Sequence, residues 1–455
     1  MMARKEILIV GAGLVGSLLA LLLARRGHKV RVIERRGDMR KQQMSAGRSI
    51  NLALSHRGLR GLDAVGLRDE VLALALPMGG RMVHDEQGQQ AFQPYGRAGQ
   101  AIHSVSRRDL NVLLINHAEG MPNVEFSFGR RCVEVDFDHT RLVVEDNEGA
   151  RSEVKGDLLF GTDGAFSAVR LAMQMKPRFN YSQSYLGHGY KELSIPATGR
   201  AGEERFALDP GALHIWPRGG FMLIALPNLD GSFTVTLFLP YEGSPSFAEL
   251  HSEAAVDDFF ARTFQDAHAL MPNLVQDFFK NPTGDLVTMR CDPWDYGGRS
   301  CLLGDAAHAI VPFYGQGMNA GFEDVRALAD LLGDGPDDDV DWPSLLGRFA
   351  QERKPNGDAI AELAIGNYYE MRDKVKDPRF LLRKKIEGRI HERYGDRYLP
   401  LYSMVTFSHL PYAEALERSR AQDALMERVL ALPDIENRFD SPEVDALVAE
   451  ALGPA

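Results

Sequence analysis

A glycine-interrupted apolar segment near the start of the chain restricts the fold more than any other feature. Residues 7–24 read ILIVGAGLVGSLLALLLA, and the strand-like HKVRVIE follows soon after. This order predicts a buried strand over residues 7–10, a helix over residues 14–26 and a second strand over residues 29–33. The two strands must run parallel in one sheet, because a helical crossover joins strands that point in the same direction.

The glycine spacing in this segment indicates a dinucleotide-binding turn. Gly11 permits the tight turn, Gly13 lets the backbone approach a pyrophosphate, and Gly16 lets the helix pack closely on the strand. Glu34 ends the second strand 23 residues after Gly11. A carboxylate at this position accepts hydrogen bonds from a ribose diol, which favours FAD or NAD over NADP. The alternative for the motif is a purely structural turn.

Composition excludes several classes of partner and site. The chain has 455 residues, and 52 Lys and Arg against 63 Asp and Glu give a net charge of −11, which does not suit nucleic acid or an anionic membrane. Cys132, Cys291 and Cys301 have neither disulfide-framework nor zinc-site spacing. The run over residues 7–24 is long enough for a membrane span, but its glycines argue against insertion. We therefore expect a cytoplasmic protein with small-molecule partners, no membrane anchor and no metal.

The predicted elements indicate an α/β protein with three regions. Residues 1–178 and 288–340 are expected to form a discontinuous Rossmann-like domain, because LLFGTDGAFSAVR and SCLLGDAAHA both repeat the order of buried strand, turn and helix. Residues 179–287 predict an antiparallel sheet from the segments ERFAL, ALHIWP, FMLIALP and SFTVTLFLP. Residues 341–455 predict helices, after an expected exposed loop, GDGPDDDVDWP.

A second glycine cluster follows in LLGDAAHAIVPFYGQGMNAG, which covers residues 302–321. Its apolar strand delivers Asp305 to a turn, where the carboxylate can accept a hydrogen bond from a sugar hydroxyl. The glycines then begin a helix whose open amides can face an anion, such as the pyrimidine edge of a reduced flavin. By itself the segment fits a capped helix after a tight turn equally well. His308 is expected to be a hydrogen-bonded structural histidine.

Four motifs in order resemble the single-component flavoprotein aromatic monooxygenases of the p-hydroxybenzoate hydroxylase type: GAGLVG, the acid Glu34, GTDGAFSAVR and LLGDAAHAIVPFYGQGMN. Several longer segments are similar to the kynurenine-hydroxylating members of that family, and together they cover nearly the whole chain. They include GRSINLALSHRG, GRMVH, QPYGR, HGYKEL and YSMVTFSHLPY. The resemblance implies an FAD-binding domain, an antiparallel-sheet substrate domain and C-terminal helices that cover the substrate pocket.

The resemblance also implies a reaction. The chain would hydroxylate L-kynurenine to 3-hydroxy-L-kynurenine with tightly bound FAD, NADPH as a transient reductant and O2, through a flavin C4a-hydroperoxide. The aniline nitrogen of the substrate already activates its ring, so we expect no catalytic side chain besides the flavin. The protein would bind the flavin, orient the ring and exclude water.

The family motifs assign FAD to the three glycine motifs and to several arginines. The expected cofactor-binding residues are Gly11, Gly13, Leu14, Gly16, Glu34, Arg35, Arg48, Arg107, Asp163, Asp305, Pro312, Gly315, Gly317, Met318 and Asn319. Arg108 lies beside Arg107 and leaves open which of the two contacts FAD. Each arginine could equally be a surface cation.

At the amino-acid end of the substrate, the family uses an Arg with tyrosines against the carboxylate and an Asn near the amine. Arg81, Tyr95, Tyr402 and Asn367 match these positions. A guanidinium can fork onto a carboxylate while phenol hydroxyls satisfy the remaining lone pairs. The aromatic ring is expected to lie on apolar side chains, which are Ile224, Leu226, Phe238 and Phe313. Without the resemblance, such positions are more often surface or core residues. Tyr314 is assigned no catalytic role.

Two other kinds of function stay open from the sequence. The same fold could hydroxylate another aromatic acid, or reduce its flavin without inserting oxygen. A non-catalytic binding protein on an FAD-type scaffold, as in the Rab escort and GDP-dissociation-inhibitor proteins, would need no helix amides directed at a flavin. Such a protein would purify without flavin absorbance.

Overall fold

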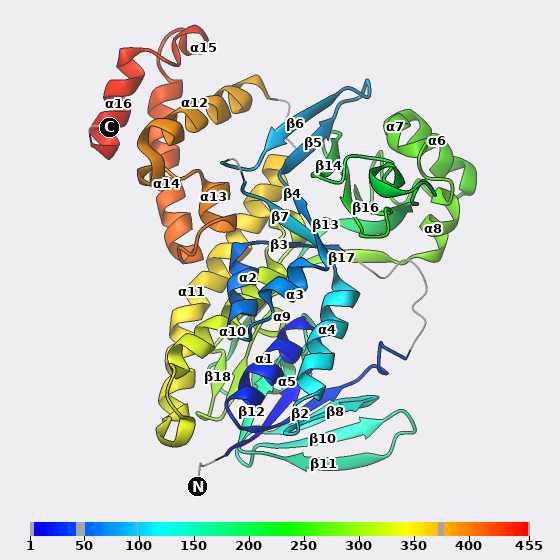
Figure 1. The fold of residues 1–455 in the computed structure, drawn as a ribbon, viewed down its shortest axis with the longest axis vertical. Helices are drawn as coiled ribbons and strands as arrows, with labels where there is room; N and C mark the ends of the chain where they lie inside the picture. Colours follow the sequence, from blue (N-terminus) through cyan, green and yellow to red (C-terminus); the bar gives the residue numbers. More distant parts are fainter. Residues whose placement is uncertain (1–3, 42–50, 98, 372–376, 454–455) are drawn as a thin grey trace.

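The computed structural model describes residues 4–41, 51–97, 99–371 and 377–453 (Figure 1). A six-stranded sheet lies in its lower half in this view, with the strand order β18-β19-β12-β1-β2-β8. All neighbouring strands are parallel except β18 and β19. In chain order the strands are β1 (Glu6–Val10), β2 (Lys29–Glu34), β8 (Val124–Phe128), β12 (Leu158–Gly161), β18 (Asp295–Tyr296) and β19 (Ser300–Leu302).

The predicted βαβ unit is confirmed and lies inside this sheet. α1 (Leu14–Arg25) connects β1 to β2, and ten of its twelve residues are buried. An apolar helix can be buried on nearly all sides here because α4 (Arg107–Glu119) and α10 (Gly317–Leu332) pack against it. Two parts of the sequence that are far apart therefore enclose one core.

Two later segments complete the same sheet, as the strand-turn-helix patterns predict. They are β12 with α5 (Ala168–Gln174) and β19 with α9 (Asp305–His308). β12 pairs in parallel with both β1 and β19. The carboxyl ends of β1, β12 and β19 consequently meet at one edge, which is where open α/β sheets bind ligands.

A seven-stranded, mostly antiparallel sheet lies in the upper right of Figure 1, with the order β17-β13-β16-β15-β14-β5-β6. Its strands are β5 (Gly80–His84), β6 (Gln90–Pro94), β13 (Asn180–Ile195), β14 (Ala212–Pro217), β15 (Met222–Pro227), β16 (Phe233–Pro240) and β17 (Thr283–Asp292). Three predicted strands are confirmed, but the segment ERFAL is not a strand. The chain forms the short 3-10 helix η1 (Gly202–Arg205) there, because a run of five residues carries too little periodicity to exclude a turn.

β5 and β6 join this sheet from residues 80–94, inside the range 1–178 expected to form the Rossmann-like domain. β5 pairs in parallel with β14, and β6 forms the outer edge. The expected substrate domain over residues 179–287 thus gains a hairpin from the N-terminal part of the chain. The placement of this hairpin matters for function because β5 carries Arg81.

The two faces of the antiparallel sheet differ, because successive side chains on a strand point to opposite sides. One face carries Trp216, Leu223 and Val235 and is buried in a core with helical residues. The helices are α6 (Glu253–Thr263), α7 (Gln265–His268) and α8 (Leu274–Lys280). The other face carries Ile215, Met222 and Phe238 and packs toward η2 (Pro312–Tyr314) and the C-terminal helices.

The C-terminal region is helical, as predicted, and appears yellow to red in Figure 1. α11 (Trp342–Tyr369) contacts strands of both sheets, β19 in the parallel one and β17 in the antiparallel one. The remaining helices are α12 (Pro378–Tyr394), η5 (Gly395–Arg397), α13 (Leu401–Thr406), α14 (Tyr412–Leu430), α15 (Ile435–Arg438) and α16 (Pro442–Leu452). Within the four described ranges, none of the helices has the length and apolar character needed to cross a membrane.

Smaller elements connect these layers. A three-stranded sheet has the order β3-β7-β4, and another has the order β11-β10-β9. Their strands are β3 (Asn51–Leu54), β4 (Ala75–Met78), β7 (Ile102–Ser106), β9 (Arg130–Asp136), β10 (Arg141–Asp146) and β11 (Arg151–Lys155). α2 (His56–Asp63) and α3 (Arg68–Leu72) lie between β3 and β4.

The tract GDGPDDDVDWP is not simply an exposed loop, and that prediction is corrected. It contains η3 (Asp337–Asp339), and the Asp337 side chain is only 4% exposed. His28 Nε2 lies 2.8 Å from one Asp337 oxygen, and Arg26 Nε donates to both oxygens at 2.8 and 2.9 Å. Burial raises the pKa of this carboxyl, but the hydrogen bonds from Arg26 and His28 outweigh it and hold the pKa below its usual range. An acidic composition suggests solvent, yet a carboxylate is buried readily where cations meet it.

Candidate active site

The first glycine loop is packed so closely that two of its glycines could not be replaced by a residue with a side chain. A Cβ atom on Gly16 would lie 1.9 Å from the Gly11 carbonyl oxygen, and a Cβ on Gly11 would lie 2.6 Å from the Thr162 carbonyl oxygen. Gly11 also has a φ of +105°, a conformation that favours glycine. The Thr162 hydroxyl donates to the Val10 and Gly11 carbonyls at 2.9 and 3.0 Å. The GTDG segment therefore holds the loop in place.

Gly13 differs from these two glycines. It is the N-cap of α1, with an ordinary φ of −74° and no side-chain cap. A Cβ at this position would meet no heavy atom within 4 Å. The space before the first amides of α1 is therefore open, and the positive end of the helix faces it. The pyrophosphate of a dinucleotide fits such a cradle.

The Glu34 carboxylate is bound to the backbone at the end of β2. Its Oε2 accepts from the Ala12 N–H at 2.8 Å, and its Oε1 accepts from the Arg36 N–H at 2.9 Å. Each oxygen has a second lone pair, so the group can also accept from a ribose hydroxyl. Arg35 is exposed beside it, and Arg48 lies outside the described residues.

The second glycine cluster delivers a carboxylate to the same sheet edge. Asp305 is the one exposed residue in the stretch from Cys301 to Ala309, all of which is described. Gly304 precedes it with a φ of +60°, and a Cβ there would lie 2.9 Å from Val15 Cγ2 on α1. Asp305 therefore emerges beside the first turn of α1, within the region that a dinucleotide on Gly13 would occupy.

The start of α10 borders the same region. Gly315 ends η2 with a φ of +65°, and no side chain caps the helix before Gly317. Pro312 is exposed, and Met318 is partly exposed. Of the expected cofactor residues, these four line the surface that the helix amides face.

Asn319 braces this turn from the protein side. It is fully buried, and its Oδ1 accepts from the Ser55 N–H at 2.9 Å. Its Nδ2 donates to the Ala53 and Gly315 carbonyls, both at 2.8 Å. The side chain thus joins the start of α10 to the junction of β3 and α2.

Asp163 caps α5 in the structure. It accepts from the Ser167 hydroxyl at 2.5 Å and from the Ala168 N–H at 2.6 Å. Burial raises the pKa of this carboxyl despite those hydrogen bonds. The carboxylate oxygens of Asp163 thus accept hydrogen bonds from the start of α5, the helix that follows β12.

The two arginines at the head of α4 point to different neighbours. Arg108 is partly buried and donates from Nη2 to the Met39 carbonyl at 3.3 Å. Arg107 is exposed, and its charge acts on Tyr190 of β13. Leu14, another expected cofactor residue, is buried at the start of α1.

A cluster of one cation and two phenols lies on the site face of the antiparallel sheet. The Arg81 guanidinium carbon lies 5.5 Å from the ring centroid of Tyr95 and 5.1 Å from that of Tyr402. The two rings stack with centroids 5.0 Å apart. The structure thus brings together residues of β5, of the turn after β6 and of α13. Such spacing is typical of cation–π contacts. Arg81 also has a side-chain hydrogen bond with Tyr95, and a guanidinium carries further donors that can bind an anion.

The charge of this cluster favours a carboxylate. Burial lowers the pKa of Arg81, but Tyr95, Tyr402 and Glu370 outweigh burial and raise that pKa above its ordinary value. Within the described part of the chain, Arg81 forms no ion pair with an acid. A protonated guanidinium in a partly desolvated position needs an anionic partner. The carboxylate of a ligand would supply it.

The expected apolar wall is assembled on one face of the sheet. Pairing of Met222 with Phe238 and of Ile224 with Thr236 puts alternate residues of β15 and β16 on the same side. Phe238 lies 4.9 Å from Phe313 of η2, measured between ring centroids. Ile224 and Tyr402 both touch the small core that contains Leu226. The apolar face therefore continues from η2 to the Arg81 cluster.

Asn367, Glu370 and Tyr314 complete this region. Asn367 is buried and donates from Nδ2 to the Phe313 carbonyl at 2.7 Å. Glu370, three residues later at the C-cap of α11, acts by its charge on Arg81 and Tyr314. Tyr314 stacks on Tyr402 with centroids 5.8 Å apart. Sequence reasoning missed Glu370, although its spacing of three residues from Asn367 could have indicated it.

His308 is a structural residue, as expected. Its ring Nε2 lies 2.6 Å from Asp324 Oδ2, and both side chains are buried. Burial lowers the pKa of His308, but the Asp324 carboxylate raises it above its ordinary value. The pair belongs to a larger charged network behind α10.

Comparison of the sequence with known proteins gives a consistent result. A family model described as an FAD binding domain matches residues 4–364. The kynurenine 3-monooxygenase of Flavobacterium johnsoniae is 49% identical and covers 99% of this chain and 100% of its own length. The Myxococcus xanthus and Dictyostelium discoideum proteins of the same name are 48% and 43% identical, and each covers 99% of this chain and 97% of its own length.

Solved structures with the same fold are more distant. The tetrameric form of 2-methyl-3-hydroxypyridine-5-carboxylic acid oxygenase has a TM-score of 0.65 at 20% identity, covering 83% of this chain and 95% of its own. PqsL of Pseudomonas aeruginosa in complex with 2-aminobenzoylacetate has a TM-score of 0.63 at 21% identity, covering 81% of this chain and 97% of its own. At these identities the likeness establishes the fold.

The open cradle at Gly13 leads to a first prediction. The substitution Gly13→Val should leave the chain folded, because a Cβ there meets no heavy atom within 4 Å. The added methyl groups would occupy the space of the pyrophosphate and lower the affinity for flavin at least about tenfold, or ~1.4 kcal/mol. Flavin absorbance per protein and far-UV circular dichroism measure the two effects. Gly347→Val is the matched control, since Gly347 on α11 also has open space before it. A Gly13→Val protein with full flavin content would show that the cradle is not used.

Proposed function

This chain belongs to the FAD-binding-domain family and to the kynurenine 3-monooxygenases within it, and from that premise we propose how its site works. The enzyme hydroxylates L-kynurenine to 3-hydroxy-L-kynurenine with FAD, and NADPH and O2 are the proposed co-substrates. The observation that carries the proposal is the meeting of Arg81, Tyr95 and Tyr402 beside an apolar sheet face. A carboxylate site next to an apolar slot matches an aromatic amino acid.

The chain offers FAD a divided site. Gly13 and α1 would hold the pyrophosphate, Glu34 the adenosine ribose, and Asp305 a hydroxyl nearer the isoalloxazine ring. The amides at the start of α10 would face the pyrimidine edge of that ring, where negative charge gathers on reduction. Bound FAD supplies the redox chemistry and oxygen activation, which no side chain can provide.

At the substrate end, Arg81 is proposed to bind the carboxylate of L-kynurenine in a two-pronged contact. Tyr95 and Tyr402 stack on each other beside the guanidinium, with centroids 5.0 Å apart. Their hydroxyls would donate to the remaining carboxylate lone pairs. Charge-assisted hydrogen bonds of this kind are stronger than neutral ones and fix the orientation of a planar group.

Glu370 and Asn367 are proposed to recognise the α-ammonium of the substrate. Glu370 lies close enough to Arg81 for its charge to raise the pKa of that residue. Glu370 and Arg81 together present a negative and a positive charge. These complement the ammonium and the carboxylate of an amino acid. Asn367, one turn earlier, holds the Phe313 carbonyl with its Nδ2 and leaves its Oδ1 as an acceptor.

The aromatic ring is proposed to lie between Ile224 and Leu226 on one side and Phe313 on the other. Aliphatic and aromatic walls position the ring and exclude water without changing its charge. The 2-amino group of L-kynurenine donates electron density to the neighbouring ring carbon, so no side chain has to remove a proton there. Residues 179–287, with the β5–β6 hairpin, are the proposed substrate domain, and residues 341–455 are its proposed cover.

A turnover assay tests the proposed function. L-Kynurenine should sharply accelerate reduction of the bound flavin by NADPH, and 3-hydroxykynurenine should accumulate in step with NADPH consumption. Acceleration without product would favour a flavin reductase, and product from another aromatic acid alone would favour a different hydroxylase. A colourless protein without flavin would favour a non-catalytic scaffold.

The role of Arg81 is tested by Arg81→Ala. Loss of the guanidinium removes the carboxylate partner, so the KM for L-kynurenine should rise at least about tenfold, which corresponds to ~1.4 kcal/mol, with unchanged FAD content. Arg97→Ala is the control, because Arg97 lies on the loop after Tyr95 with its side chain 54% exposed. Steady-state kinetics measure both variants. An unaltered KM in Arg81→Ala would remove Arg81 from the substrate site.

The role of Glu370 is tested with two substrates. Glu370→Gln should raise the KM for L-kynurenine at least about fivefold, because an amide cannot neutralise the ammonium. The KM for the analogue that lacks the α-amine should change by less than about twofold. An equal rise for both compounds would assign Glu370 to the arrangement of Arg81 rather than to the ammonium.

A further inference from the structure

The helix that carries Tyr402 is held at its carboxyl end by one arginine from another part of the chain. α13 has six residues, from Leu401 to Thr406. Arg57 of α2 donates from Nε to the Val405 carbonyl at 2.7 Å and from Nη2 to the Met404 carbonyl at 3.1 Å. Its Nη2 also donates to the carbonyl of Leu410, beyond the helix. Arg57 thus satisfies the Val405 carbonyl at the end of the helix, and it shares the Met404 carbonyl with the Ser408 hydroxyl, which donates to it at 2.5 Å.

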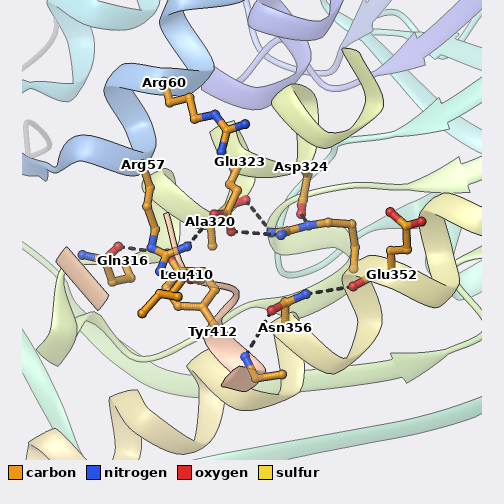
Figure 2. Close-up of polar contacts among 12 residues, drawn as sticks. Arg57, Arg60, Gln316, Ala320, Glu323, Asp324, Glu352, Asn356, Leu410 and Tyr412 are labelled. Carbon is orange, nitrogen blue, oxygen red and sulfur yellow. Dashed lines mark hydrogen bonds and ion pairs between the residues drawn. The ribbon is translucent and has the colours of Figure 1, made fainter. Parts of the chain in front are cut away.

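Arg57 reaches these carbonyls from inside the protein. Its side chain is 0% exposed, and its guanidinium carbon lies 4.0 Å above the ring of Tyr412. Its Nη1 donates to Glu323 Oε1 of α10 at 2.5 Å (Figure 2). The Tyr412 hydroxyl donates to Gln316 Oε1 at 2.9 Å, directly before α10. One guanidinium therefore joins the end of α13 and the start of α14 to α10.

The network continues to the second glycine cluster. Arg353 of α11 donates to Glu323 Oε2 at 2.9 Å and to Asp324 Oδ1 at 2.8 Å. Asp324 accepts from the Gly304 N–H at 2.9 Å, beside the expected flavin residue Asp305. Burial raises the pKa of Glu323, but Arg353 and Arg57 outweigh it and hold that pKa below its usual range. Each arginine faces a carboxylate, and Asp324 also pairs with His308, so these buried charges are partnered and the network can be buried as a unit.

A helix as short as α13 needs such support. Isolated helices of about six residues are unstable, because too few hydrogen bonds repay the cost of ordering the first turn. The ring of Tyr402 must nevertheless lie within a few ångströms of Arg81 and Tyr95 to form the carboxylate site. The position of Tyr402 therefore depends on what holds the two ends of α13.

We propose that Arg57 is a positioning residue for substrate binding, which fixes α13 against α10 so that Tyr402 stands at the substrate carboxylate. The role rests on the proposed site of Arg81, Tyr95 and Tyr402. It requires a planar fork that can serve the end of α13, Leu410 and Glu323 together. A lysine, which is a point charge with three rotating donors, cannot reproduce that geometry.

The experiment compares three single variants and one background. Arg57→Lys keeps the charge, and Arg57→Met keeps the length of the side chain. Arg60→Met is the matched control, because Arg60 lies one turn along α2 with its side chain 40% exposed and pairs with Asp330 at 3.3 Å. Each is also made in a Tyr402→Phe background. The Kd of L-kynurenine is taken from its acceleration of flavin reduction, with FAD content, melting temperature and peroxide formed per NADPH as further readouts.

The positioning role predicts coupling between Arg57 and Tyr402. Arg57→Lys and Arg57→Met should raise the kynurenine Kd at least about tenfold and increase peroxide per NADPH. In the Tyr402→Phe background the same changes should raise Kd by less than about twofold, because the hydroxyl that Arg57 positions is already absent. Arg60→Met should stay within about twofold in both backgrounds. FAD content should be unchanged in the Arg57→Lys protein.

Three results would overturn the inference. In the first, Tyr402→Phe weakens kynurenine binding, but the effects of the Arg57 and Tyr402 changes on the binding free energy are fully additive. That result would contradict the role of Arg57 and leave the proposed substrate site intact. An unaltered Kd in Tyr402→Phe alone would contradict the site and the inference together. If Arg57→Met fails to fold, Arg57→Lys and Glu323→Gln replace it, and the test is again whether their effects on the kynurenine Kd shrink in the Tyr402→Phe background. Variants that lose flavin, stability and kynurenine affinity in parallel would mark Arg57 as a purely structural residue.

Discussion

The parallel pairing of β12 with both β1 and β19 is the constraint on which the rest of the structure depends. Parallel neighbours end at the same edge of a sheet, so a loop after each strand must face the same space. Gly16 packs closely on Gly11 and Gly304 packs closely on Val15, whereas Gly13 has open space before it and Asp305 is exposed. Backbone packing, together with the Thr162 hydroxyl and the Glu34 carboxylate, thus shapes the first glycine loop.

The second sheet supplies what the first cannot. Its strands separate an apolar face, buried under helices, from a face that remains partly open at Arg81 and Ile224. The alternation of side chains along β15 and β16 makes this division unavoidable once one face is covered. η2 packs against both the antiparallel sheet and α13, because Phe313 contacts Phe238 while Tyr314 stacks on Tyr402. The proposed substrate position on the open face would therefore lie near η2, which directly precedes α10.

Buried charges fix α2, α10, α11 and α13 relative to one another. Taking an ion out of water costs several kcal/mol in real proteins, so a network of four ions must be nearly complete to be tolerated. Arg57, Glu323, Arg353 and Asp324 meet that condition through mutual ion pairs and through backbone groups at Gly304 and in α13. An apolar core would join α2, α10 and α11 as well, but it would allow them to slide. Directional hydrogen bonds define one arrangement.

The sequence by itself determined the βαβ unit, the two later strand-turn-helix segments, three of the seven strands of the antiparallel sheet and the helical C-terminal region, because periodicity and glycine spacing are local properties. It also indicated Arg81, Tyr95 and Tyr402, but only through resemblance to a family. Tertiary structure alone decided that the β5–β6 hairpin leaves its neighbours for the second sheet, that Asp337 is buried between two cations, and that Glu370 acts on Arg81. These outcomes depend on which distant surfaces fit each other once desolvated, and no short window of residues encodes that fit.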